Sequence, residues 1–240
     1  MPKVKQRVEA VRLYRLNSKR TQTRKAAESP EHFGTEIIAE SNAVIIPETS
    51  SERRHYIPIG FIGPDTFCSN AVRLVPNASI YHFGVLHSHF HNSWMRAVAG
   101  RLESRYRYSA GMVYNTFVWP NPTPEQKSNI ESCAQRVLDA RDNHAGDSLA
   151  TLYDPDKMPD DLLDAHKSLD AAVEAAYGVS FQGDEEKIIA HMFKLYEKAV
   201  SKEKGSKAPA NKNVSSEREL KVSPHAVKVK VKVKSDRSDS

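Results

Sequence analysis

The sequence predicts an α+β protein in which short, mixed strands precede an array of helices. Residues 35–75 hold short β-branched and aromatic runs interrupted by Gly, Pro and Asn, a pattern typical of strands joined by turns. From residue 85 onward, most apolar residues recur every three to four positions, the period of a helix packed on one face. Residues 201–240 are rich in Lys, Ser, Pro and Asn without apolar clusters, which predicts a disordered basic tail.

The first elements are expected to be a basic helix and several strands. Val4, Val8 and Val11 follow the spacing of one helix face among Lys and Arg, so residues 3–17 are expected to be helical. Residues 18–32 fit either an exposed connection or a continuation of that helix. Strands are expected within 35–46 as a pair about a turn at 40–42, at 56–62, and at 72–75 with a continuation over 79–81.

The middle of the chain is expected to pass from helix to connector to strand. Residues 85–98 have apolar side chains with a helical period, and Gly100 is placed to end that helix. Residues 101–109 are polar, aromatic and basic, and are expected to form an extended connector. Residues 113–119 are expected to form a short strand, closed by the Pro-Asn-Pro sequence that follows.

Helices are expected to dominate the remainder. Thr123 can cap a helix that has Pro124 at its first position and extends to about residue 142. A short segment at 149–153 precedes two further helices, at 159–177 and 184–199. These expectations divide the chain into a first region at 1–80, a second at 81–200, and the tail, in which the alternating Val and Lys of 227–234 are expected to remain flexible.

The formal net charge of +5 conceals a strong asymmetry along the chain. Residues 1–110 hold 16 Lys and Arg against 9 Asp and Glu, residues 111–200 hold 8 against 16, and residues 201–240 hold 11 against 5. A basic first half suits a polyanionic partner, because each neutralised phosphate releases condensed counterions. An ordinary solvated basic surface is the alternative.

The composition does not indicate a membrane or secreted protein. Apolar runs stay well below the length of about eighteen residues that a spanning helix needs, and the charged N-terminus lacks the apolar core of a signal peptide. Cys68 and Cys133 are the only cysteines and lie far apart, which favours free thiols in a reducing cytosol. We therefore expect a cytoplasmic protein.

Three short motifs resemble catalytic or metal sites, but each has a simpler interpretation. His87, His89 and His91 would need a strand to share one face, whereas their segment is predicted to be helical, so structural or exposed roles are favoured. The Asn-Pro-Thr sequence at 121–123 lacks the second proline and the aromatic residue of an adenine-binding loop. The Glu-Glu-Lys sequence at 185–187 has the spacing of a nuclease metal site but no upstream Pro-Asp pair.

The segment at 100–109 combines three arginines, one glutamate and two tyrosines. Arg is the best bidentate donor to guanine O6 and N7, Glu can accept from cytosine N4, and Tyr and Ser can bond phosphate oxygens. Aromatic residues interleaved with Arg favour an interaction surface over a solvated loop. Glu103 and Arg105 are expected to read one C·G base pair together, because i and i+2 side chains of an extended connector point the same way.

This segment belongs to an ordered series of motifs that resembles one family. The series comprises Ser-Ser-Glu-Arg-Arg-His-Tyr-Ile-Pro-Ile-Gly-Phe at 50–61, Tyr-His-Phe-Gly-Val-Leu at 81–86, Trp-Met-Arg-Ala-Val at 94–98, the run at 101–109, and Tyr-Asn-Thr-Phe-Val-Trp-Pro at 114–120, with shorter runs at 137–141, 152–155, 158–159, 169–170 and 175–178. Across about residues 3–200 the chain resembles the MmeI-like class I S-adenosylmethionine-dependent DNA methyltransferases.

The resemblance implies a role in DNA recognition. Family members usually join a nuclease region, a connector and an N6-adenine methyltransferase domain to a target-recognition domain and a C-terminal helical region, and this chain resembles only the last two. The target-recognition portion would lie at 1–80 and the C-terminal region at 81–200. The implied partner is double-stranded DNA. The full-length family uses S-adenosylmethionine, but we expect this chain to hold no cofactor and to have no catalytic residues of its own.

The resemblance also implies which residues contact DNA. Related members vary at the positions of Glu103 and Arg105, often with Lys and Asp in their place. Asn70, Ala71 and Arg107 match positions that the family uses for neighbouring bases. The expected DNA contacts are completed by Arg53, Arg101 and Ser104.

Two other functions stay open at this stage. The chain could be an inert remnant of a disrupted restriction–modification gene, or its acidic helices could dock a methyltransferase domain or subunit encoded upstream. An intact methyltransferase gene ending just before the chain would favour a split subunit, whereas a frameshifted one would favour a remnant.

Overall fold

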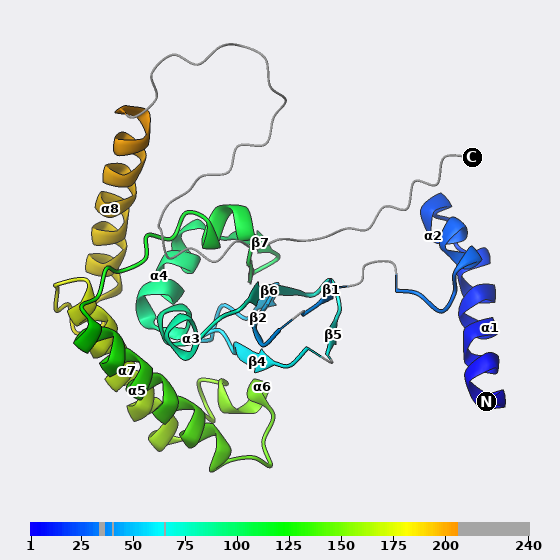
Figure 1. Ribbon diagram of the computed structural model, residues 1–240, viewed down its shortest axis with the longest axis horizontal. Coiled ribbons are helices and arrows are strands. Elements are labelled where there is room, and N and C mark those ends of the chain that lie inside the picture. Colours follow the sequence, from blue (N-terminus) through cyan, green and yellow to red (C-terminus); the bar gives the residue numbers. More distant parts are fainter. Residues whose placement is uncertain (34–36, 40, 65, 206–240) are drawn as a thin grey trace. The chain divides into compact units, whose positions relative to one another are not determined.

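The computed structural model describes residues 1–33, 37–39, 41–64 and 66–205, which form two compact units (Figure 1). The smaller unit holds the described residues up to 38 together with 66–70, and the larger holds those of 39–64 and 71–205. The expected tail lies outside the described residues, including its alternating run at 227–234. Residues 201–205 are an exception, because they continue the last helix.

The smaller unit contains the expected basic helix, α1 (Pro2–Leu16). It is followed by α2 (Thr21–Lys25) and a 3-10 turn, η1 (Ala26–Glu28). Arg15 of α1 holds the segment at 26–32 against this helix, because it donates to the carbonyls of Ala26, Ser29 and His32 at 2.7, 2.9 and 2.7 Å. A two-residue strand, β1 (Ile37–Ile38), pairs antiparallel with β5 (Phe67–Cys68).

The central sheet of the larger unit has the strand order β4-β2-β6. Its middle strand is β2 (Ala43–Pro47), flanked by β4 (Gly60–Ile62) and β6 (Val72–Pro76) in antiparallel register. The expected pairing of two strands across 40–42 is wrong, since β1 and β2 pair with different partners. The strand expected at 56–62 is shorter, because the Ile57 N–H donates to the Asn92 side chain at 2.8 Å rather than to a strand.

A second sheet has the order β3-β8-β7 and replaces the expected extended connector. Its strands are β3 (Thr49–Ser50), β7 (Gly100–Leu102) and β8 (Arg105–Arg107). The connector expectation failed because these strands are polar at almost every position, so they show no apolar alternation that would distinguish a hairpin from a loop.

The helix expected at 85–98 is two helices, α3 (Ile80–His87) and α4 (His89–Val98). The break is at Ser88, which has an extended backbone with ψ of 160° and donates through Oγ to the Val85 carbonyl at 2.7 Å. Because Ser79 caps α3, residues 79–81 do not extend a strand. The strand expected at 113–119 is also wrong. There, a π-helical turn, η2 (Ala110–Tyr114), is followed by irregular chain.

The remaining helices match the sequence expectations closely. They are α5 (Pro124–Asp142), α6 (Leu149–Leu152), α7 (Asp160–Ala176) and α8 (Glu185–Gly205), and Figure 1 shows α5 and α7 running side by side. Thr123 and Gln126 form a capping box at the start of α5. In the described part of the chain, no helix has the length and apolar character to cross a membrane.

A buried arginine of α5 joins the helices to the central sheet. Arg141 donates to the Ile59 carbonyl at 2.9 Å and, through two nitrogens, to the Tyr153 hydroxyl at 2.8 and 2.6 Å. Its Nη2 also lies 3.2 Å from a ring nitrogen of His87. Burial, together with the nearby charges, holds the pKa of His87 well below its ordinary value, so this ring is neutral and can accept a hydrogen bond.

The same network continues through α7. The Tyr153 hydroxyl is 2.9 Å from Nε2 of His166, whose ring stacks on Tyr56 at 4.0 Å between centroids. Tyr56 donates its hydroxyl proton to Asp170 at 2.6 Å, and the His89 N–H donates to the other carboxylate oxygen at 2.6 Å. Burial raises the pKa of Asp170 to about 7. Residues from the sheet region, α3, α4, α6 and α7 therefore share one polar core.

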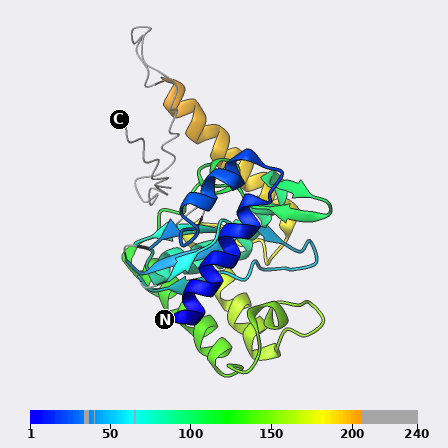
Figure 2. The same ribbon diagram turned by 90° about the vertical axis from the view of Figure 1, so that its right-hand side faces the viewer.

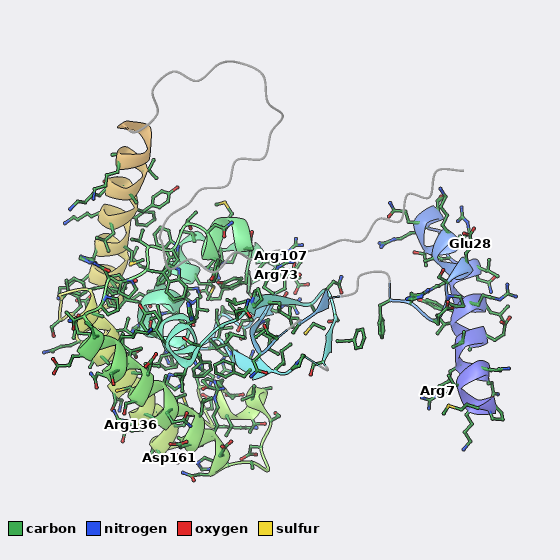
Figure 3. The ribbon with its side chains drawn as sticks, in the orientation of Figure 1. Arg7, Glu28, Arg73, Arg107, Arg136 and Asp161 are labelled. Carbon is green, nitrogen blue, oxygen red and sulfur yellow. The ribbon has the colours of Figure 1, made fainter. Side chains whose placement is uncertain are left out.

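We expect Arg141→Met to lower the free energy of unfolding by about 2–4 kcal/mol, because the Ile59 carbonyl and the Tyr153 hydroxyl would be left buried without their donor. Denaturant titration of the full chain measures this change. Arg136→Met is the matched control. Arg136 is exposed on the same helix (Figure 3) and should change stability by no more than about 0.5 kcal/mol. Equal effects of the two substitutions would contradict the role given to Arg141.

Candidate nucleic-acid interface

The β7–β8 hairpin holds most of the residues expected to contact DNA, and it projects from its unit (Figure 2). Its register pairs Gly100 with Arg107, Arg101 with Tyr106, and Leu102 with Arg105, which leaves Glu103 and Ser104 as a two-residue turn. Glu103 has a φ of 57°, in the left-handed region. A non-glycine residue there costs about 1–2 kcal/mol, and such outliers are often found at functional sites.

The hairpin separates its arginines onto two faces. Side chains of directly paired residues lie on the same face of an antiparallel sheet, so Arg105 and Arg107 share the exposed face that also includes Leu102. Arg101 lies on the opposite face, with its guanidinium 3.8 Å from the ring centroid of the buried Tyr106. The three arginines of this segment therefore do not form a single row.

Glu103 and Arg105 meet at the tip of the hairpin. Nη2 of Arg105 donates to Oε2 of Glu103 at 2.8 Å, and the side chains of Arg105 and Glu103 are 46% and 78% exposed, respectively. An exposed pair of this kind contributes about 0–1 kcal/mol to stability, so both groups can change partners easily. The two side chains lie together, as the sequence predicted, but a turn rather than an extended connector brings them together. That they read one base pair stays a prediction. Ser104, also exposed, accepts through its carbonyl from Arg101 Nη1 at 3.1 Å.

A charged cluster at the base of the hairpin includes two residues that sequence reasoning missed. Glu48 accepts from Nε of Arg107 at 3.0 Å and lies 3.2 Å from Nη2 of Arg73, and Figure 3 shows these two arginines close together. The Glu48 backbone donates to the Ala71 carbonyl at 2.8 Å and accepts from the Tyr108 N–H at 2.7 Å. No local pattern predicts this cluster, because its residues are far apart in the sequence.

The other expected contact residues lie elsewhere. Ala71 is beside Glu48 through the hydrogen bond just described, whereas Asn70, its neighbour in sequence, belongs to the smaller unit with β5. Arg53 is in the loop after β3 and donates to Asp156, between α6 and α7, at 2.5 Å. This hydrogen bond raises the pKa of the Arg53 guanidinium. Arg53 is thus tied to the helical region and not to the hairpin.

The three histidines of the H-x-H-x-H run have separate structural environments. His87 faces Arg141, and His89 begins α4 beside Asp170. His91 donates from Nδ1 to the Leu86 carbonyl at 2.7 Å and accepts from the Tyr108 hydroxyl at 3.0 Å, which anchors the end of the hairpin to α4. Burial lowers the pKa of His91 to about 4, so the ring stays neutral.

The two other short motifs also have structural explanations. Thr123 forms the N-terminal cap of α5, and Glu185 accepts from Arg96 at 2.6 Å. Across the residues that the structure describes, no group of three or more His, Cys, Asp or Glu side chains could hold a metal ion.

These features define a class of protein: an α+β module that presents a charged hairpin on a helical support. The particular family follows from comparison with known proteins. Residues 1–121 match the family model described as the MmeI target recognition domain, and residues 122–202 match the MmeI C-terminal domain. The chain therefore belongs to the MmeI family, as its motifs indicated.

Two relatives support this assignment. The chain is 39% identical over 202 residues to DNA methyltransferase A of Bacillus subtilis (strain 168), covering 84% of this chain and 23% of that protein. It is similar to a solved structure of the Type IIL restriction-modification enzyme MmeI in complex with DNA, with 46% identity and a TM-score of 0.76, covering 82% of this chain and 26% of that one. The chain spans about a quarter of the length of these relatives.

The turn geometry gives a test that needs no DNA. We expect Glu103→Gly to have a free energy of unfolding about 1 kcal/mol higher than Glu103→Ala, because glycine adopts a positive φ without steric cost. Both variants remove the carboxylate and its pairing with Arg105, so their difference isolates the backbone. Denaturant titration measures it. An alanine variant as stable as the glycine variant would show that the turn is not strained.

Proposed function

We propose that this chain reads a double-stranded DNA sequence on behalf of an N6-adenine DNA methyltransferase. The single observation that carries the proposal is the exposed face of β8, where Arg105 and Arg107 lie together beside the Glu103 tip. A two-stranded ribbon can enter the major groove, where base edges carry a unique pattern of donors and acceptors. Membership of the MmeI target-recognition family supports the same function.

Glu103 and Arg105 are proposed to read one C·G pair. Arg105 would donate to guanine O6 and N7, and Glu103 would accept from the cytosine amine. Their present contact of 2.8 Å supports this assignment, because two groups one hydrogen bond apart can address the two bases of one pair. On binding, their weak mutual pairing would be exchanged for contacts with bases.

The other expected residues receive supporting roles. Arg107 would read a neighbouring base from the same face, and Ala71 and Asn70 would contribute to bases nearby. Arg101, Arg53 and Ser104 would contact the phosphate backbone, since Arg101 is on the opposite face and Arg53 is in a separate loop. Such contacts position the protein on the duplex without carrying sequence information.

Methyl transfer is proposed to depend on a methyltransferase domain or subunit that this chain serves. Support comes from the glycines, since S-adenosylmethionine would require a glycine-rich turn that leads from a strand into a helix. In the described part of the chain, Gly60 and Gly100 lie in strands, Gly63 lies between the strands β4 and β5, Gly84, Gly111 and Gly205 lie within α3, η2 and α8, and Gly146, Gly178 and Gly183 lie between helices. These residues do not fit that cofactor, and we propose no catalytic step within the chain.

The basic contacts can be tested by replacing Arg53, Arg101 and Arg107 together with Ala. DNA affinity should fall at moderate salt, and the slope of log K against log salt should become shallower by about one for each phosphate that is no longer neutralised. Fluorescence anisotropy over a salt series measures both. Arg136→Ala, in the acidic helical region, is the control and should change neither quantity. Unchanged affinity in the triple variant would refute the assignment.

The base-reading pair can be tested by exchanging its charges. In the variant Glu103→Lys with Arg105→Asp, joined to a competent methyltransferase domain, the C·G pair in the methylated site should be replaced by G·C at one position. A good bidentate contact discriminates by about 1–3 kcal/mol, so mapping methylated sites should reveal the change. Glu103→Gln with Arg105→Gln controls for loss of charge and should relax the preference without reversing it. A site that keeps C·G everywhere would instead indicate an ordinary surface ion pair.

A further inference from the structure

One apolar side chain lies on the charged face of the β7–β8 hairpin. Leu102 is paired directly with Arg105, so their side chains share the face that also carries Arg107. Gly100 is paired with Arg107, and a Cβ placed on this glycine would meet no atom of the described residues within 4 Å. Nothing from β7 therefore covers this face, and Leu102 is the apolar group that it presents beside the two arginines.

Packing within the protein does not account for Leu102. The residue is 45% exposed. Among the described residues, it belongs neither to the hydrophobic core nor to the partly buried apolar side chains that pack against that core. The side chain that holds the hairpin down is the buried Tyr106, which lies on the opposite face. Single exposed apolar residues are common in proteins, but this one lies on a paired strand beside groups that are proposed to meet bases.

The major groove of DNA offers one apolar feature that such a side chain can recognise, the 5-methyl group of thymine. The Cβ atoms of directly paired residues lie about 4.5–5.5 Å apart, slightly more than the rise of about 3.4 Å between successive base pairs. When Arg105 reaches one base pair, Leu102 can therefore reach the base pair beside it.

We propose that Leu102 packs on the 5-methyl group of a thymine in the base pair next to the C·G pair, and so adds a preference for thymine at that position. This inference rests on the proposed function. It adds an apolar contact to the charged contacts of Glu103 and Arg105. Burial of one additional CH2-sized group corresponds to about fourfold in affinity.

The test begins with selection from a randomised duplex library by the full chain. The wild type should select C·G together with thymine in an adjacent base pair. Leu102→Ala should keep the C·G preference and lose the preference for thymine, because the truncated side chain no longer reaches the methyl group.

Deoxyuridine then isolates the methyl group, since it pairs as thymine does and lacks only that group. In fluorescence anisotropy titrations, the wild type should bind the deoxyuridine duplex about fourfold more weakly than the thymine duplex. Leu102→Ala should bind both duplexes equally, whereas Leu102→Met, of similar volume, should largely keep the difference. Leu149→Ala is the matched control, because Leu149 is 38% exposed in α6 and should leave the fourfold ratio unchanged.

Three results would overturn the proposal. A lower melting temperature in Leu102→Ala with an unchanged ratio between the two duplexes would mean that Leu102 only supports the fold. Loss of the C·G preference itself in this variant would mean that Leu102 only supports the hairpin tip. A methyl group added to C5 of the cytosine in the C·G pair should change wild-type affinity by less than about twofold. A larger gain that Leu102→Ala abolishes would place Leu102 over that pair instead of its neighbour.

The wild-type chain separates failure of this inference from failure of the proposed function. A wild type that selects C·G but binds the thymine and deoxyuridine duplexes equally would overturn the Leu102 contact alone. A wild type without any base preference would overturn the proposed function and the contact together.

Discussion

The buried guanidinium of Arg141 is the contact on which the larger unit depends. Arg141 is 8% exposed, and among the described residues no carboxylate pairs with it, so the charge is satisfied by hydrogen bonds and by the rings of Phe83 and Tyr153, whose centroids lie 5.3 and 4.9 Å from the guanidinium carbon. Its partners are the Ile59 carbonyl before β4, the Tyr153 hydroxyl after α6, and His87 at the end of α3. If these partners moved away, the buried guanidinium would lose its hydrogen bonds. The contacts therefore hold the three segments in place around α5. The helical region thus fixes the sheet region, although the two match separate family models.

This arrangement gives the hairpin a fixed base and a free tip. At the base, Tyr106 is buried, the Tyr108 hydroxyl bonds His91, and Glu48 connects both sheets through its backbone and its side chain. At the tip, Glu103 and Arg105 are exposed and bond each other at 2.8 Å. Precise recognition needs side chains held on a rigid element, and the hairpin is held at its base while the charged side chains at its tip stay exposed.

The separation of base and tip has a consequence for how recognition could change. The exposed pair at the tip contributes about 0–1 kcal/mol to stability, far less than the buried network around Arg141. Substitutions at Glu103 and Arg105 can therefore alter the groups that the hairpin tip exposes while the fold stays intact. Arg107 differs, since its Nε–H donates to Glu48 at the base of the hairpin at 3.0 Å. A change at that position would involve the base of the hairpin as well.

The sequence by itself determined the elements whose signals are local. The Thr123 cap, Pro124 and the apolar spacing of α5, the stop at Gly178, where φ is 73°, and the spacing of α1 all lie within a few residues of the structure they specify. The family motifs, including the segment at 100–109, could also be recognised in the sequence.

Only the tertiary structure decided that this segment is a hairpin, that Arg101 faces away from Arg105 and Arg107, and that α3 and α4 are separate. The reason is that these features depend on partners distant in sequence, such as Glu48, 59 residues before Arg107, and Asp170, 81 residues after His89. Periodicity and capping report a residue's neighbours along the chain, whereas a polar strand with a single buried tyrosine takes its register from the sheet it joins.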